Sequence, residues 1–148
     1  MIRLRPQQFD QRIATAEVAF RRLGHVDVAD LGAVRGTPRT FSIRIDHPDW
    51  GLPTAASLEF VERWILSGTT WELTRYAYEL RMVPGPGRLA FHWHDGRYHT
   101  HCVDSNHPDR DHHYRGGAVD LFAAYEDFGR MLASGSPITC QALTPLRS

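Results

Sequence analysis

Apolar side chains recur at intervals of three and four residues near the start of the chain, which is the periodicity of an amphipathic helix. The positions are Phe9, Ile13, Ala16, Phe20 and Leu23. Proline is common at the beginning of helices and glycine just past their ends, so Pro6 and Gly24 support a helix over residues 7–23. We predict that its apolar stripe packs on the core.

A second helical pattern covers residues 119–133, where one stripe is apolar. That stripe consists of Leu121, Tyr125, Phe128 and Leu132. Asp120 is suited to cap the first turn through its carboxylate, and Gly135 and Pro137 are typical of the region where a helix ends. We therefore predict a C-terminal helix.

Between these helices the pattern changes to the alternation of β-strands. Four consecutive segments alternate in this way: Leu58 to Leu66, Trp71 to Val83, Arg88 to His94, and Arg97 to Val103. Turn sequences separate them at Ser67-Gly68, Pro84-Gly85-Pro86-Gly87 and Asp95-Gly96. The aromatic residues at strand spacing, among them Trp64, Trp71, Tyr76 and Tyr78, are assigned to core packing.

Residues 25–56 are interrupted by glycine and proline, and only Thr40 to Ile45 reads as a strand among loops. Ile138 to Leu143 is predicted to add a short last strand. The order of elements predicts an α+β fold: a mainly antiparallel meander sheet of about five strands with both helices on one face. A length of 148 residues suits a single domain, 1–148, with one core.

Composition narrows the classes of function. Hydrophobic residues make up 42% and charged residues 23% of the chain, which is typical of a globular protein. The start has no apolar run long enough for a signal peptide or membrane span, so a cytoplasmic location without membrane contact is expected. All 17 basic residues are arginine, which excludes lysine Schiff-base chemistry and a phosphate-binding Walker lysine.

The two cysteines, Cys102 and Cys140, do not form a Cys-x-x-Cys pair. A zinc ribbon and a redox motif are therefore unsupported. We expect both to be reduced thiols within the core.

Histidine is concentrated in one region, because seven of the nine histidines lie between His92 and His113. Asp95-Gly96 suits a two-residue type I′ turn, which fixes the register of the hairpin. The predicted cross-strand pairs are His94 with Arg97, Trp93 with Tyr98, His92 with His99, and Ala90 with His101.

This register separates the two faces of the hairpin. The core face carries Leu89, Phe91, Trp93, Tyr98, Thr100 and Cys102. The opposite face carries Arg88, His92, His94, Arg97, His99 and His101. The following segment, 104–117, is predicted to be a polar loop that can fold His112 and His113 back over the sheet.

The leading interpretation is metal-free acid/base cleavage of RNA, a candidate endoribonuclease activity. One imidazole would take the proton of the 2′-hydroxyl, a second would protonate the leaving oxygen, and arginine would stabilise the developing charge. The candidate catalytic residues are His92, His94, His99, His101, His112 and His113. Candidate anion-binding residues are Arg88, Arg97 and Arg115, with Arg63, Arg75 and Arg81 on neighbouring strands in reserve.

Two alternatives stay open. Pairs of His-x-His on adjacent strands converge within reach of one ion, so His92, His94, His99 and His101 could bind a divalent transition metal such as zinc in a hydrolase or oxidoreductase. The absence of a His-Glu-x-x-His motif and of a carboxylate on that face weighs against this. A third interpretation is a non-enzymatic surface that binds another protein.

Four motifs between Ser57 and Leu132 are informative together: Ser-Leu-Glu-Phe-Val-Glu-Arg at 57–63, Tyr76-Ala-Tyr78, the hairpin from Arg88 to His101, and His112-His113. In these motifs the segment resembles the TumE-like toxins of bacterial toxin–antitoxin systems. Asp104-Ser105-Asn106 follows the family's acidic-Asn turn only loosely, and Tyr114-Arg115-Gly116 replaces its further histidine. The resemblance implies a toxin that acts on RNA, and a neighbouring helix-turn-helix antitoxin that neutralises it.

Overall fold

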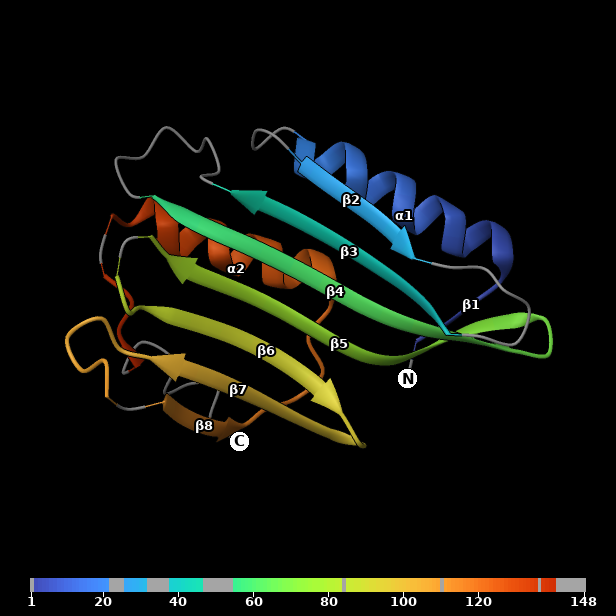
Figure 1. Cartoon of the computed structure of the whole chain (residues 1–148). Coiled ribbons are helices and arrows are strands. Elements are labelled where there is room, and N and C mark those ends of the chain that lie inside the picture. The colour runs from blue at the N-terminus through green and yellow to red at the C-terminus, as the bar shows by residue number, and fades with distance from the viewer. Residues whose placement is uncertain are drawn as a thin grey trace.

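A computed structural model describes residues 2–21, 26–31, 38–46, 55–83, 85–109, 111–135 and 137–140. These residues form one antiparallel sheet and two helices, the predicted α+β architecture (Figure 1). No helix in this described part of the chain is long and apolar enough to cross a membrane.

The sheet has eight strands, seven of which follow the order β2-β3-β4-β5-β6-β7-β8. The eighth, β1, pairs with β5. Their bounds are β1 Arg3–Leu4, β2 Val26–Leu31, β3 Arg39–Asp46, β4 Ala56–Ser67, β5 Thr70–Met82, β6 Arg88–His94, β7 Arg97–Val103 and β8 Asp111–Arg115. The predicted meander of consecutive strands is confirmed and extends further at both edges.

Both helices agree closely with the sequence pattern. Helix α1 covers Pro6–Arg21 and α2 covers Leu121–Ala133. The Asp120 carboxylate caps α2 by accepting a hydrogen bond of 3.0 Å from the backbone N–H of Phe122. Gly135 adopts a φ of 63° just after α2, a conformation that glycine reaches without strain. The predicted end of the first helix at Leu23 and Gly24 lies outside the described residues.

The core lies between the helices and one face of the sheet. Phe9 packs edge-on against Trp64 of β4, and Phe20 packs against Phe60, also of β4. Phe128 of α2 contacts Phe60 and stacks on Phe91 of β6. Both helices therefore cover the same face, and no described helix covers the other, which we call the open face.

One charged pair is buried beneath the helices. The Glu62 carboxylate is 1% exposed and accepts hydrogen bonds from Arg12 at 2.7 Å, Tyr78 at 2.6 Å and Trp64 at 3.1 Å. Arg12 also contacts Asp120, which links α1 to the start of α2. Because each carboxylate oxygen has partners, this group ties the helices to the sheet without an unpaired buried charge.

Three predictions about secondary structure were wrong in part. The loop over 104–117 contains β8, and the segment 25–56 contains β2 as well as β3. Ile138 and Thr139 are not in a strand, while 141–143 lie outside the described residues. β8 was missed because Asp-His-His-Tyr-Arg has no apolar alternation.

The prediction of reduced cysteines was also wrong. Cys102 and Cys140 form a disulfide, with their Cα atoms 5.8 Å apart. Cys102 lies on the core face of β7, and the segment after α2 returns beside it, where Ser105 donates a backbone hydrogen bond to Ile138. Spacing along the sequence could not reveal this return.

Candidate functional site: a histidine cluster on the open face

The β6–β7 hairpin has the register predicted from its turn. Asp95 and Gly96 have φ values of 51° and 71°, as a type I′ turn requires. The pairs His94 with Arg97, Trp93 with Tyr98, His92 with His99 and Ala90 with His101 are all present. The imidazoles consequently project from the open face and the aromatic rings from the core face.

Four histidines from three strands form one group, which we call the histidine cluster: His92, His99, His101 and His113. The ring centroids of His92 lie 5.3 Å from His99 and 4.7 Å from His101. His99 and His101 are 4.8 Å apart, and His101 and His113 only 4.0 Å apart. His113 joins them because β8 pairs His101 with His113.

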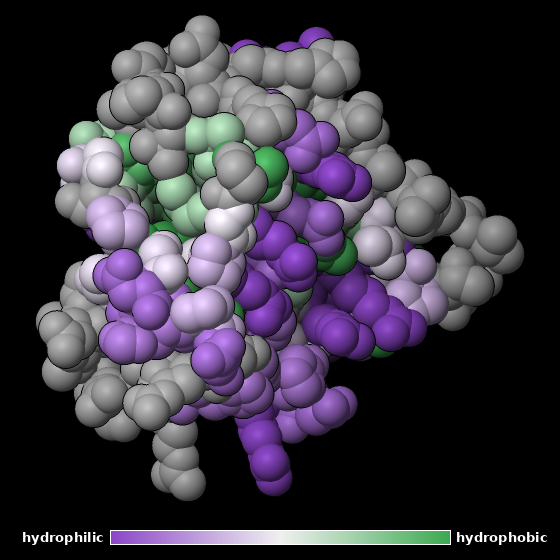
Figure 2. Space-filling model, turned by 60° about the vertical axis from the view of Figure 1, so that its left-hand side comes forward, coloured by the Kyte–Doolittle hydropathy of each residue, from purple (hydrophilic) through white to green (hydrophobic). Residues whose placement is uncertain are grey.

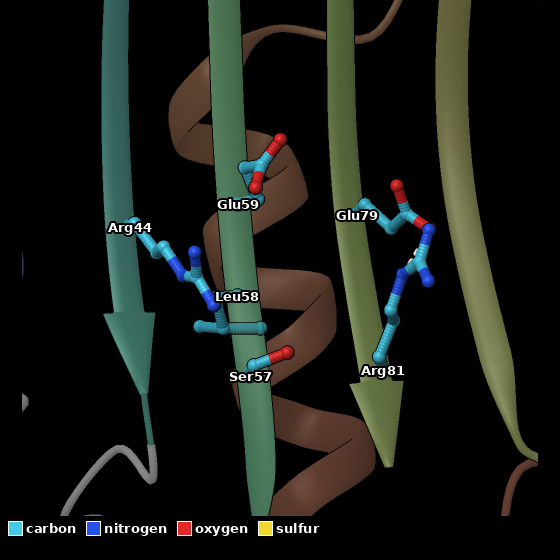
Figure 3. A pocket seen from close by; sticks show the side chains of 6 residues that line it. All are labelled: Arg44, Ser57, Leu58, Glu59, Glu79 and Arg81. Carbon is cyan, nitrogen blue, oxygen red and sulfur yellow. Dashed lines mark hydrogen bonds and ion pairs between the residues drawn. The ribbon is translucent and has the colours of Figure 1, made fainter. Parts of the chain in front are cut away.

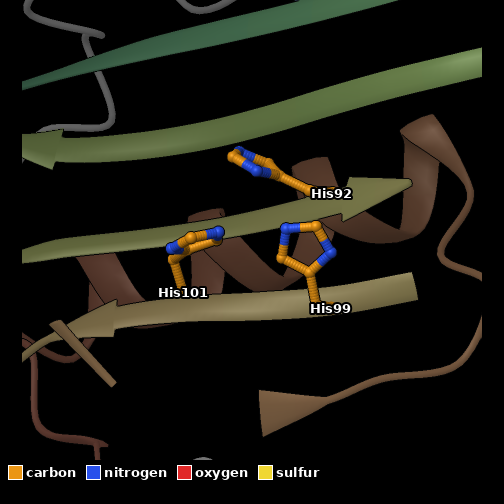
Figure 4. Close-up of side chains that lie close together, drawn as sticks. All are labelled: His92, His99 and His101. Carbon is orange, nitrogen blue, oxygen red and sulfur yellow. The ribbon is translucent and has the colours of Figure 1, made fainter. Parts of the chain in front are cut away.

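Three of these side chains can direct a nitrogen at a common point. His92, His99 and His101 each offer a ligand atom, and these atoms all lie within 4.8 Å of one another. Figure 4 shows the three rings on the same side of the hairpin, with His92 coming from β6 and His99 and His101 from β7. The Nε2 atom of His92 is buried and has no hydrogen-bond partner among the residues that the structure describes.

The cluster disfavours protonation of its inner members. Burial, then the neighbouring His101, His99 and Arg88, lower the pKa of His92 to about 4. Burial and the adjacent His101, His94 and His113 also lower the pKa of His99. Both imidazoles are therefore neutral near pH 7, the form that binds a metal or accepts a proton.

The other predicted site residues lie around this group. The His94 ring is 4.7 Å from His99, but its Nδ1 atom lies 3.1 Å from the Asp95 carboxylate in the turn. His112 occupies the alternate position on β8, in register with Cys102 rather than His101. His112 and His113, both predicted as catalytic candidates, therefore occupy alternate positions of β8, and only His113 is in register with a histidine of the cluster.

The predicted anion-binding arginines differ in their surroundings. Arg88 contacts the Glu79 carboxylate, which also accepts a hydrogen bond from Arg81 at 2.7 Å. Burial alone would raise the pKa of Glu79, but these two hydrogen bonds outweigh it and lower the pKa. Arg97 is exposed at the hairpin turn, and Arg115 is in register with His99.

Glu79 belongs to a hollow of about 300 Å³ further along the open face, which is lined by Arg44, Ser57, Leu58, Glu59, Glu79 and Arg81 (Figure 3). Hydrophilic side chains run through the middle of the view in Figure 2, which brings the left-hand side of Figure 1 forward. Two of the arginines that line this hollow are ion-paired, Arg81 with Glu79 and Arg44 with Asp46. Sequence reasoning missed Glu79, since an acidic residue on a strand gives no signal of its own.

Comparisons with models of protein families, with curated proteins and with solved structures found no match. The resemblance to TumE-like toxins therefore stays a prediction that rests on short motifs.

Proposed function

We propose that the histidine cluster binds one divalent transition metal, and that the protein is a metal-dependent hydrolase. The observation that carries the proposal is the convergence of His92, His99 and His101, whose ligand atoms all lie within 4.8 Å of one another. Nitrogens bound to one zinc ion stand roughly 3–4 Å apart, so small rotations of these rings suffice to close the site.

The chemistry of the three donors suits this role. Imidazole is a common ligand of zinc, copper, nickel and iron, and it must be neutral to coordinate. The lowered pKa values of His92 and His99 keep both rings neutral without a metal. A metal would also give the buried Nε2 atom of His92 the partner that it lacks.

Three histidine ligands on an open face leave room for a further ligand, as in catalytic rather than structural zinc sites. An ion in such a site supplies Lewis acidity and lowers the pKa of the water it binds. His113, 4.0 Å from His101 between ring centroids, is exposed and stands where it can exchange a proton with a substrate.

Metal-free cleavage of RNA is the second candidate. It is favoured by the unequal surroundings of two nearby imidazoles, because His92 is half-buried and neutral whereas His113 is exposed. It ranks below the metal site because the acid step needs an imidazole that is protonated near pH 7. Lowered pKa values remove His92 and His99 from that role, so of the histidine cluster only His101 and His113 are left for it.

Metal titration of untagged, chelator-treated protein tests the proposal. We expect one equivalent of Zn²⁺ or Co²⁺ to bind, with Co²⁺ absorption bands typical of nitrogen coordination. His92→Ala, His99→Ala and His101→Ala are expected to weaken binding by roughly 100-fold or more. His107→Ala is the matched control, because His107 is an exposed histidine in the loop after β7.

Wild-type protein that takes up no ion would overturn the metal site. Equal losses in His107→Ala and the cluster variants would do the same. RNA cleavage that persists in chelator and disappears in His113→Ala would favour the second candidate instead.

A further inference from the structure

A row of positive charge crosses the open face beside the histidine cluster. Arg63 of β4 pairs directly with Arg75 of β5, and His94 of β6 pairs with Arg97 of β7. The β5–β6 register, which pairs Tyr76 with Trp93, brings Arg75 level with His94. We call Arg63, Arg75 and Arg97 the arginine row.

The three arginines share one side of the sheet. Each lies beside residues of the core face: Arg63 beside buried Glu62 and Trp64, Arg75 beside buried Tyr76, and Arg97 beside the partly buried Tyr98. All three are exposed. Arg63 and Arg75 stand opposite each other across two strands, an arrangement of like charges that costs stability unless an anion lies between them.

The arginine row differs from the other charges of this face. Arg44, Arg81 and Arg88 form ion pairs with Asp46 and Glu79. Within the part of the chain that the structure describes, Arg63, Arg75 and Arg97 have no carboxylate partner. Positive charge is thus neutralised at one end of the open face and left available at the other.

A shallow hollow of about 260 Å³ lies along the row. It is lined by Thr40, Val61, Arg63, Arg75, Tyr76 and Ala77. Val61 and Ala77 are small side chains of the adjacent row, in which Ala77 pairs with His92. The hollow therefore extends from the arginines toward the histidine cluster without a bulky side chain between them.

The length of the row indicates the size of the ligand. Neighbouring strands lie about 4.8 Å apart, so Arg63 and Arg97, three strands apart, are separated by roughly 14 Å between backbones. A single phosphate cannot contact both ends of such a row, whereas an extended chain of phosphates can. Guanidinium groups match phosphate oxygens in geometry and stay charged at all relevant pH values.

We infer that the open face binds single-stranded nucleic acid through its phosphate backbone, with the arginine row as the binding residues. Successive residues on the same face of a strand are about 6.7 Å apart. A phosphate held at Arg75 therefore lies near Ala77, which is level with His92 and His99 on the next two strands. This inference rests on the proposed function, a hydrolase that acts at the histidine cluster, and deepens it by naming the substrate class, a phosphodiester. The binding itself does not require the metal.

Recognition is expected to be electrostatic. Apart from histidine, the described strands β3 to β7 place no aromatic side chain on the open face, so base stacking is limited to imidazole. Binding should therefore depend little on base sequence. It should weaken steeply with salt, with a slope of log K against log salt of about −2 for three phosphates.

Fluorescence anisotropy with labelled 12-nucleotide RNA and DNA single strands, in chelator and 50 mM salt, tests the inference. We expect micromolar binding of both strands, several-fold weaker binding for Arg63→Gln, Arg75→Gln or Arg97→Gln, and a salt slope reduced by about 0.7 for each. The triple variant should lose at least 30-fold. Arg81→Gln is the control, because it removes the same charge from an exposed but ion-paired arginine of this face.

An equal loss in Arg81→Gln, or absence of binding by the wild type, would overturn the arginine row. So would tighter binding of polyglutamate than of the oligonucleotides, because an acidic protein segment would then be the better occupant. Zn²⁺ titration of the triple variant separates this inference from the proposed function: intact metal uptake with lost RNA binding assigns the loss to the row alone. Circular dichroism confirms that the variant is folded.

Discussion

His92 is the residue on which the site depends most. It lies on β6, and its ring contacts those of His99 and His101 on the adjacent strand β7. Half-burial and positive neighbours oppose its charged form. The same features that make His92 a candidate ligand therefore make protonation of the folded protein costly.

This cost predicts a dependence of stability on pH. The pKa of His92 is about 4 in the folded protein and about 6.5 in an unfolded chain, so between these values only the unfolded chain binds the proton. The contribution of His92 to the free energy of unfolding should be complete above pH 6.5 and should decrease as the pH is lowered toward 4. We expect His92→Gln to remove about 1 kcal/mol of the decrease between pH 7 and pH 5, after allowance for solvent screening.

Urea unfolding in chelator at both pH values measures this difference. His107→Gln, at an exposed position, should retain the wild-type decrease. The interpretation fails if His92→Gln and the wild type lose the same free energy between pH 7 and pH 5.

At the scale of elements, the disulfide fixes the segment that follows α2 against the strand that carries His99 and His101. Cys102 lies in β7 next to His101, and its partner Cys140 is 38 residues further along the chain. Cross-linking a loop of this length reduces the entropy of the unfolded chain by an amount worth about 4 kcal/mol.

We therefore expect Cys102→Ala/Cys140→Ala to unfold at lower urea concentration, with a loss of about 2–4 kcal/mol. Dithiothreitol should destabilise the wild type similarly and leave the double variant unchanged. Two titratable thiols in denatured, unreduced protein, together with no effect of dithiothreitol, would contradict the disulfide. Because disulfides persist mainly in oxidising compartments, the same thiol titration on protein in intact cells tests the predicted cytoplasmic location.

The elements that the sequence predicted are those with a strong period. The β6–β7 register followed from Asp95-Gly96 alone, and the two helices followed from their apolar stripes. β8 has five consecutive polar or aromatic residues, so only its pairing with β7 reveals it as a strand. The place of His113 in the cluster, and the partner of Cys102, depend on these contacts between distant segments.

The arginine row also depends on contacts that the sequence pattern does not reveal. Arg63 and Arg75 are separated by a turn and a shift of register between Arg63 and Trp64, which leaves Thr74 as an extra residue. Thr74 donates a hydrogen bond to the Arg63 carbonyl at 3.1 Å within this irregularity. Counting from the turn without the bulge pairs Arg63 with Thr74 and places the two arginines on opposite faces. Their juxtaposition was visible only in the folded sheet.

At the scale of the whole molecule, one side of the sheet carries packing and the other carries chemistry. The helices and the buried Glu62 group occupy the first side. The histidine cluster, the arginine row and the hollow of Figure 3 share the second. A ligand that binds across the open face can contact imidazole and guanidinium together, which fits the phosphodiester chemistry expected of a toxin that acts on RNA.

Inducible expression in a bacterial host, with growth and RNA integrity followed over time, tests this prediction. We expect the wild type to stop growth and degrade RNA, because it retains both the proposed nucleic-acid binding and the proposed reaction. His92→Ala should remove both effects through loss of the reaction, and the triple variant of the arginine row through loss of binding. Arg81→Gln should remain toxic, since Arg81 belongs to the ion-paired end of the open face.

The pattern among the variants decides between the remaining alternatives. If the wild type leaves growth and RNA unchanged, the toxin prediction is wrong. If His92→Ala and the arginine variants remain as toxic as the wild type, the open face is not responsible. If growth stops while RNA stays intact and all variants retain their folds, RNA is not the target, and a surface that binds another protein becomes the interpretation to test. Rescue by a helix-turn-helix protein encoded beside the gene would support the predicted antitoxin.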